Sequence, residues 1–122
     1  MGTEVQSTDF QTKVLDSIQG TADDAYQAML DKKAKYEAAK KQLGVFEAAK
    51  QNAYTKFKTA KQHSTTGKEG EFIFARAEYN SVLSNYTDAD NNVDILRDSL
   101  LGSIFYSGKM NNSAAIANAT LG

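Results

Sequence analysis

The sequence contains no cysteine, no proline and no tryptophan, and only one histidine. Without cysteine the chain can form neither disulfides nor thiolate metal sites, and cysteine usage does not indicate its redox compartment. The absence of proline removes the strongest helix breaker and permits long uninterrupted helices. No stretch approaches the roughly 20 apolar residues of a membrane-spanning helix, and residues 1–10 lack a signal-peptide pattern. We therefore expect a soluble protein without a membrane span.

Residues that would carry catalysis or bind metal are also missing from the sequence. His63 has no cysteine and no second histidine to join it in a metal site, and no Ser-His-Asp set or Gly-x-Ser-x-Gly motif is present. Asp90 and Asp94 share a helix face with each other but not with Asp88, and the glycine-bearing loop of an EF-hand is absent. We expect no catalytic residues, no metal site and no cofactor, and we predict that the protein is not an enzyme.

Two heptad patterns of apolar residues dominate the sequence. Positions a and d of a heptad recur every seven residues and form the apolar seam of a coiled coil. In the first pattern twelve of fourteen such positions are apolar: Leu15, Ala22, Met29, Tyr36, Leu43 and Phe57 at a, with Ile18, Ala25, Ala39, Phe46, Ala53 and Ala60 at d. In the second, Phe72, Tyr79, Tyr86, Val93 and Leu100 alternate with Ala75, Val82, Ala89, Leu96 and Ser103. Lys32 and Lys50 interrupt the first pattern, where they either specify register or oligomeric state or extend their ammonium groups to water.

The two patterns fit each other when the chain is folded antiparallel near Thr66. Pairing residues whose numbers sum to 132 sets a large side chain against a small one in most layers, for example Phe57 against Ala75 and Ala53 against Tyr79. Small residues allow the helix backbones to approach closely while the rings fill the remaining space. The sequence therefore predicts an all-α, long antiparallel two-helix hairpin of coiled-coil type.

Charge supports the same pairing. Residues 31–61 hold nine lysines and three acids, a net charge of +6, whereas residues 69–98 hold seven acids and two arginines, a net charge of −5. Each exposed ion pair contributes only about 0 to 1 kcal/mol, so these charges select the antiparallel arrangement more than they stabilise it. Because the acidic arm neutralises the basic one, nucleic acid is not an expected partner.

Breaker residues divide this single domain into segments. Thr8 and Asp9 are candidate N-caps, and Gly20 followed by Thr21 indicates a kink or break in the helix. The segment rich in Ser, Thr and Gly after Gln62 is the only strong internal turn signal, and the composition after Tyr106 lacks the bulk to fold alone. We predict a short N-terminal helix, a first arm, a turn, a second arm and an irregular C-terminal tail, over residues 8–19, 21–62, 63–70, 71–106 and 107–122.

The end of the hairpin opposite the turn is the candidate interaction surface. Apolar residues surround the second arm there, and an isolated hairpin cannot cover the whole circumference of a helix. Either a partner subunit buries this end, or residues 9–19 or the tail fold back as a third helix. The predicted interface residues are Phe10, Val14, Leu15, Ile18, Leu101, Ile104, Phe105 and Ile116.

Residues 77–87 (AEYNSVLSNYT) and 92–98 (NVDILRD) resemble the second helix of needle subunits of type III secretion systems, and residues 31–35 (DKKAK) resemble the end of the first. The match covers about a quarter of the chain. It departs from the family in lacking a proline-bearing turn, in a longer hairpin and in the segment after Ser107. The resemblance implies a helical hairpin that stacks into a hollow filament.

These features predict a structural subunit that self-associates as a homo-oligomer or packs against partner proteins. A phage or virus particle (virion) and an extracellular secreted filament are the expected locations. The alternative is an adaptor or binding module whose exposed stripe receives an amphipathic helix from a partner. The adaptor would remain a monomer or dimer, whereas the structural subunit would form large regular assemblies.

Overall fold

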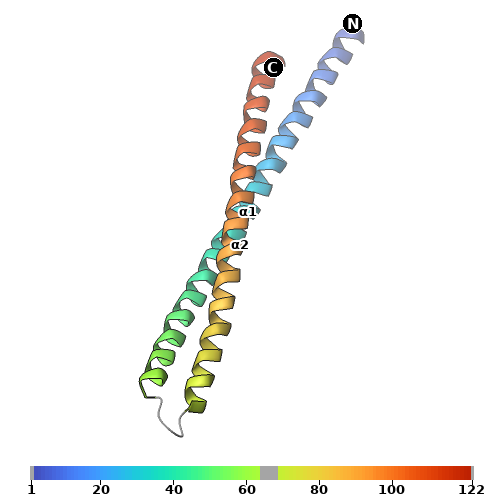
Figure 1. Ribbon diagram of the computed structural model, residues 1–122. Helices are drawn as coiled ribbons and strands as arrows, with labels where there is room; N and C mark the ends of the chain where they lie inside the picture. The colour runs from blue at the N-terminus through green and yellow to red at the C-terminus, as the bar shows by residue number, and fades with distance from the viewer. Residues whose placement is uncertain (1, 64–68, 122) are drawn as a thin grey trace. The chain divides into compact units, whose positions relative to one another are not determined.

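The computed structural model contains two long helices, α1 (Gly2–Gln62) and α2 (Glu69–Leu121), which pack against each other (Figure 1). It describes the backbone of residues 2–63 and 69–121 and the side chains of residues 9–63 and 69–121. No strand occurs within these ranges. The predicted all-α helical hairpin is therefore confirmed.

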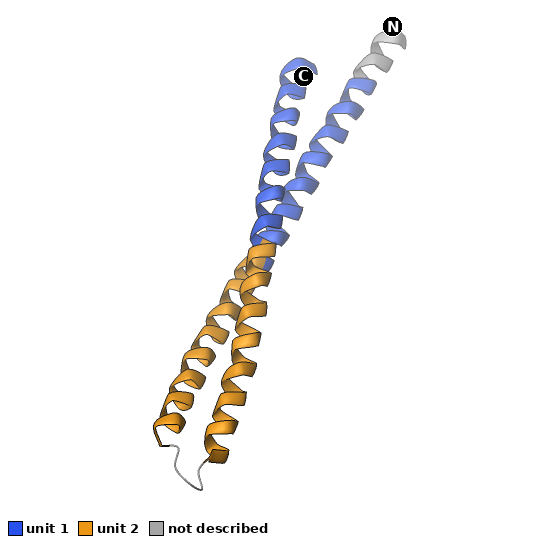
Figure 2. Cartoon of the chain, in the orientation of Figure 1, with its two compact units in different colours: residues 1–35, 97–122 blue, residues 36–96 orange. Residues whose placement is uncertain are grey.

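The contacts divide the chain into two compact units, each made from part of α1 and part of α2 (Figure 2). Unit 2 comprises residues 36–96, a continuous stretch of sequence. Unit 1 combines residues 1–35 with residues 97–122. This division does not test the prediction that the chain is a single domain.

In unit 2 the ring contacts agree with the predicted register. The Phe57 ring lies 5.5 Å from that of Phe72 and 5.8 Å from that of Tyr79, measured between centroids. Phe72 and Tyr79 are one turn before and one turn after Ala75, so Phe57 occupies the space that this alanine leaves. In the neighbouring layer Ala53 is 3% exposed, as expected for a small residue opposite Tyr79. The seam of unit 2 thus consists of rings packed over alanines.

Lys50 contributes to this seam although it carries a charge. Its side chain is half-buried, and its Nζ lies 3.9 Å from the centroid of the Tyr86 ring. An ammonium group over a ring face is attracted by the π electrons. Lys56 forms an ion pair with Glu78 at 3.5 Å between Nζ and Oε1, which also connects the two helices. The two arms therefore interact through charge as well as through packing.

In unit 1 the predicted helix break at Gly20 is wrong, as is the predicted start near Thr8. Helix α1 begins at Gly2 and continues without interruption through Gly20. On either side of this glycine the heptad stays in phase, with Ile18 half-buried before it and Ala22 buried after it. Seam packing on both sides compensates for the roughly 1 kcal/mol that glycine costs within a helix.

The predicted irregular tail is also wrong. Helix α2 continues to Leu121, and the seam continues with it. Ser107 and Ala114 are buried, while Met110, Ala117 and Leu121 are half-buried at the intervening heptad positions. These mostly small side chains pack closely against α1 and need little bulk to do so. Because both helices are continuous, no segment within the described residues folds back as a third helix.

The connection between the helices is shorter than predicted. Helix α1 ends at Gln62, as expected, but α2 begins at Glu69 rather than after residue 70. Glu69 and Glu71 in its first turn favour this start, because carboxylates interact well with the positive end of the helix dipole. Residues 64–68 of the predicted turn lie outside the described residues.

Candidate functional surface

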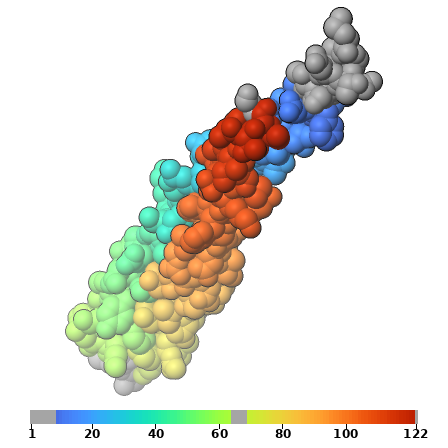
Figure 3. Space-filling model, turned by 90° about the horizontal axis from the view of Figure 1, so that it is seen from above, coloured from blue at the N-terminus to red at the C-terminus, as the bar shows by residue number. Residues whose placement is uncertain are grey.

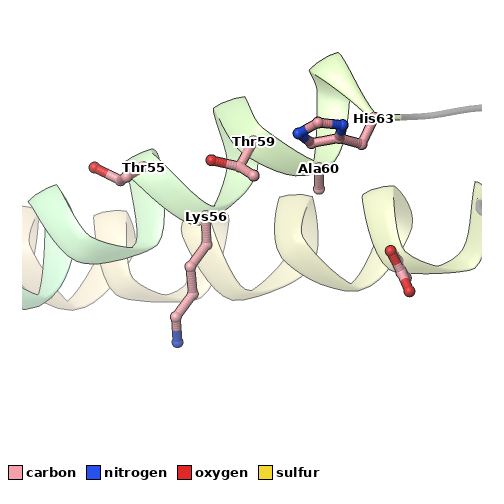
Figure 4. Close-up of a pocket in the computed structure, with 6 residues that line it drawn as sticks. Thr55, Lys56, Thr59, Ala60 and His63 are labelled. Atoms are coloured by element: carbon pink, nitrogen blue, oxygen red, sulfur yellow. The ribbon is translucent and has the colours of Figure 1, made fainter.

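A shallow hollow of about 300 Å³ lies in unit 2 where α1 ends (Figure 4). It is lined by Thr55, Lys56, Thr59, Ala60, His63 and Glu71. In Figure 4 the labelled side chains point in different directions, with Lys56 extending away from His63. Catalysis and tight ligand binding require polar groups that converge on one point. This hollow is open and lacks such convergence, so we do not consider it the functional site.

The described residues contain no group of three or more His, Asp or Glu side chains that could hold a metal ion. Among them, too, no helix is long and apolar enough to cross a membrane.

Both units expose large apolar side chains, seven in the described part of unit 1 and six in that of unit 2, but the group on neighbouring turns of α2 in unit 1 is the larger cluster. All four aromatic residues of the described part of unit 1 are exposed, including Phe105 at 81% and Phe10 at 68%. Leu101, Ile104, Phe105 and Tyr106 lie within two turns of α2, and we call them the 101–106 cluster. In Figure 3 the red surface of the end of α2 lies beside the blue surface of α1. An exposed apolar cluster of this kind is typical of an interaction site.

The eight predicted interface residues all lie in unit 1. Five of them are exposed, namely Phe10, Leu101, Ile104, Phe105 and Ile116, while Val14, Leu15 and Ile18 are half-buried. Leu15 and Ile18 occupy seam positions, so at least part of their apolar surface is used against α2. Whether any of the eight contacts another subunit stays a prediction.

The chain exposes more area than a globular monomer of its mass, as two helices without a further layer of structure must. Folded monomers of 13.3 kDa expose about 6,500 Å². This chain exposes 8802 Å², which is about 2,300 Å² more. A partner in a stable protein–protein interface of standard size buries about 800 Å². The chain therefore has enough additional surface for more than one such interface.

A second face with heptad spacing, which the sequence alone did not reveal, lies on the outer side of α2 in unit 1. Leu101, Phe105, Gly108, Asn112, Ala115 and Ala119 are spaced alternately by four and three residues, and all six are exposed. This is the spacing of a second heptad, turned away from the seam. The composition of the tail concealed it, because four of the six residues are small or polar.

The chain matches no family model, no curated protein and no solved structure.

Proposed function

We propose that this protein is a non-enzymatic structural subunit that self-associates through unit 1. The observation that carries the proposal is the exposure of the 101–106 cluster on a helix whose other face already packs in the seam. Burial of each exposed large apolar side chain contributes about 1.5 to 3 kcal/mol, so a few of them suffice to drive association. The seam of the hairpin preforms this surface.

Such a subunit would repeat within a virus or phage particle or within a secreted filament. The resemblance of residues 77–87 and 92–98 to needle subunits supports the filament, since those proteins are helical hairpins that stack. A contact between identical surfaces closes a dimer, so growth into a ring or a filament also requires a contact between different surfaces of successive copies.

The test is the mass distribution of the protein across concentration, measured by sedimentation together with electron microscopy of the same sample. We expect regular particles or filaments that grow with concentration. A monomer at every concentration would contradict self-association and would favour the adaptor, which docks a partner helix.

The double substitution Ile104→Asp with Phe105→Asp locates the contact. We expect it to abolish assembly, because association would bury two unpaired carboxylates. Ile73→Asp with Phe74→Asp is the matched control, since these neighbours are also exposed on α2 but lie in unit 2. Normal assembly of the Ile104 and Phe105 variant would show that the cluster is not the contact.

A further inference from the structure

We infer that two copies of this chain pair antiparallel through the outer stripe of α2. The two-fold axis between them crosses α2 at the height of Met110. We define the outer stripe as Leu101, Phe105, Gly108, Asn112, Ala115 and Ala119. This inference rests on the proposed function and identifies the partner of the surface in unit 1 as the same surface of a second copy.

The outer stripe lies on the side of α2 opposite the seam. The seam positions Leu100, Ser107 and Ala114 are buried against α1, whereas every residue of the outer stripe is exposed. With 3.6 residues per turn, the alternate spacing of four and three residues keeps the outer stripe on one face of the helix. Helix α2 therefore carries two faces suited to helix packing, and the hairpin uses one of them.

The outer stripe is complementary to itself only when two copies run antiparallel. Pairing about Met110 sets Leu101 against Ala119, Phe105 against Ala115 and Gly108 against Asn112. Each large side chain then faces a small one, as Phe57 and Ala75 do within the hairpin. Parallel pairing would instead place Phe105 on Phe105 and alanine on alanine, which leaves voids. One self-complementary surface is what a two-fold dimer requires.

Gly108 lies within the outer stripe, where the absence of a side chain permits a second helix to approach closely. A Cβ added at this position would meet nothing within 4 Å, as at the other described glycines, so the subunit itself leaves this space open.

Charge also favours association of this face with itself. Between Ser99 and Leu121 the only charged residue is Lys109, so pairing leaves few charges to be desolvated. The two-fold axis brings the two copies of Lys109 near each other at the edge of the contact. We expect their repulsion to be weak, so that added salt or Lys109→Gln tightens the dimer about two- to five-fold.

Cross-linking tests the geometry, because the chain has no native cysteine. We would mix the single variants Leu101→Cys and Ala119→Cys and treat them with a short bis-maleimide. We expect cross-linked pairs in the mixture and few from either variant alone. Leu101→Cys mixed with Ala77→Cys is the control, since Ala77 is exposed on α2 in unit 2. Efficient linking of Leu101→Cys to itself, or equal linking to the Ala77 variant, would overturn the antiparallel pairing.

An exchange of large and small residues tests the packing. We expect Phe105→Ala and Ala115→Phe each to weaken the dimer at least ten-fold, and the double variant to recover to within about three-fold of the parent. Both positions are exposed, so helix content by circular dichroism should be unchanged. Ala48→Phe, at an exposed position of α1, is the control for the added ring. A double variant weaker than either single variant would overturn the inference.

Failure of this inference and failure of the proposed function give different results. If the parent protein is monomeric at every concentration, both fall. If it assembles but shows neither the Leu101 to Ala119 link nor the recovery by exchange, self-association stands and the pairing through the outer stripe falls.

Discussion

The two units use their aromatic side chains in different ways, although both are built from the same two helices. In unit 2 six of eight aromatic rings are half-buried in the seam, where they pack over alanines and over one another. In the described part of unit 1 none of the four aromatic rings lies in the seam, and all four are exposed. The seam of unit 1 is filled by alanine, serine, methionine, leucine, Ile18 and Lys32 instead.

This difference separates stability from interaction. A ring placed between two helices stabilises the hairpin, since most of its area leaves water on folding. The same ring on the outer side contributes little to the stability of the hairpin. It contributes to the free energy of association when another molecule covers it. Unit 2 therefore uses most of its rings to stabilise the hairpin, although Phe74 is exposed, whereas unit 1 leaves all four of its described rings available for contact.

The largest expected difference concerns one phenylalanine from each unit. Phe57→Ala should lower the free energy of unfolding by about 2 to 4 kcal/mol, because it leaves a gap between Phe72 and Tyr79. Phe105→Ala should change it by no more than about 0.5 kcal/mol at concentrations where the protein is a monomer. Urea denaturation followed by circular dichroism measures both. Equal losses would show that Phe105 stabilises the subunit and would remove the distinction between the units.

Enlarging a seam alanine should also affect the units unequally. Ala53→Leu should cost about 1 to 3 kcal/mol, because the rings around it have no space to move. The cost of Ala22→Leu in unit 1 should be smaller, since the predicted register sets it opposite Met110, a flexible residue that can adapt. Thermal unfolding of both variants, with Ala48→Leu as the exposed control, tests this. A larger loss for Ala22→Leu than for Ala53→Leu would contradict the account of the two seams.

Replacing one helical glycine in each unit should give the same small gain. Gly20→Ala and Gly44→Ala should each stabilise the protein by about 0.5 to 1 kcal/mol, since a Cβ meets nothing within 4 Å at either position. The shift in the midpoint of thermal unfolding measures the gain. A loss of stability in Gly20→Ala alone would indicate that α1 needs to bend there.

The smallest expected effect is that of the ion pair between Lys56 and Glu78 in unit 2. Both side chains are at least half exposed, so a double-mutant cycle with Lys56→Ala and Glu78→Ala should give a coupling of about 0.2 to 1 kcal/mol. The coupling should decrease at high salt. A coupling that does not change with salt would mean that the two residues interact through packing.

Heptad periodicity predicted the hairpin well because packing follows it directly. Every seam position predicted between Leu15 and Ala60, and between Phe72 and Ser103, is buried or half-buried, including Lys32 and Lys50. The errors arose where local composition was given more weight than periodicity. Gly20 was interpreted as a kink or break although the heptad continued across it, and residues 107–121 were interpreted as irregular because their seam residues are small.

The candidate surface was predicted in part, and for a physical reason. The sequence identified the cluster around Ile104 and Phe105 because bulky residues surround the helix there. It assigned Leu15 and Ile18 both to the seam and to the interface, whereas the structure has them half-buried at seam positions and Phe10 exposed. That distinction depends on how far the pairing of the helices extends, and the alanines and serines of the tail do not reveal this by their hydrophobicity.

The position of each unit's segments along the sequence also sets the order in which the two units can form during synthesis. Unit 2 is continuous in sequence, so its contacts need only short loop closure and can form once residue 96 has left the ribosome. Unit 1 joins residues 1–35 to residues 97–122, and its first segment must wait for the second. The surface proposed for self-association would therefore be completed after unit 2, which would limit pairing between growing chains on the same messenger RNA.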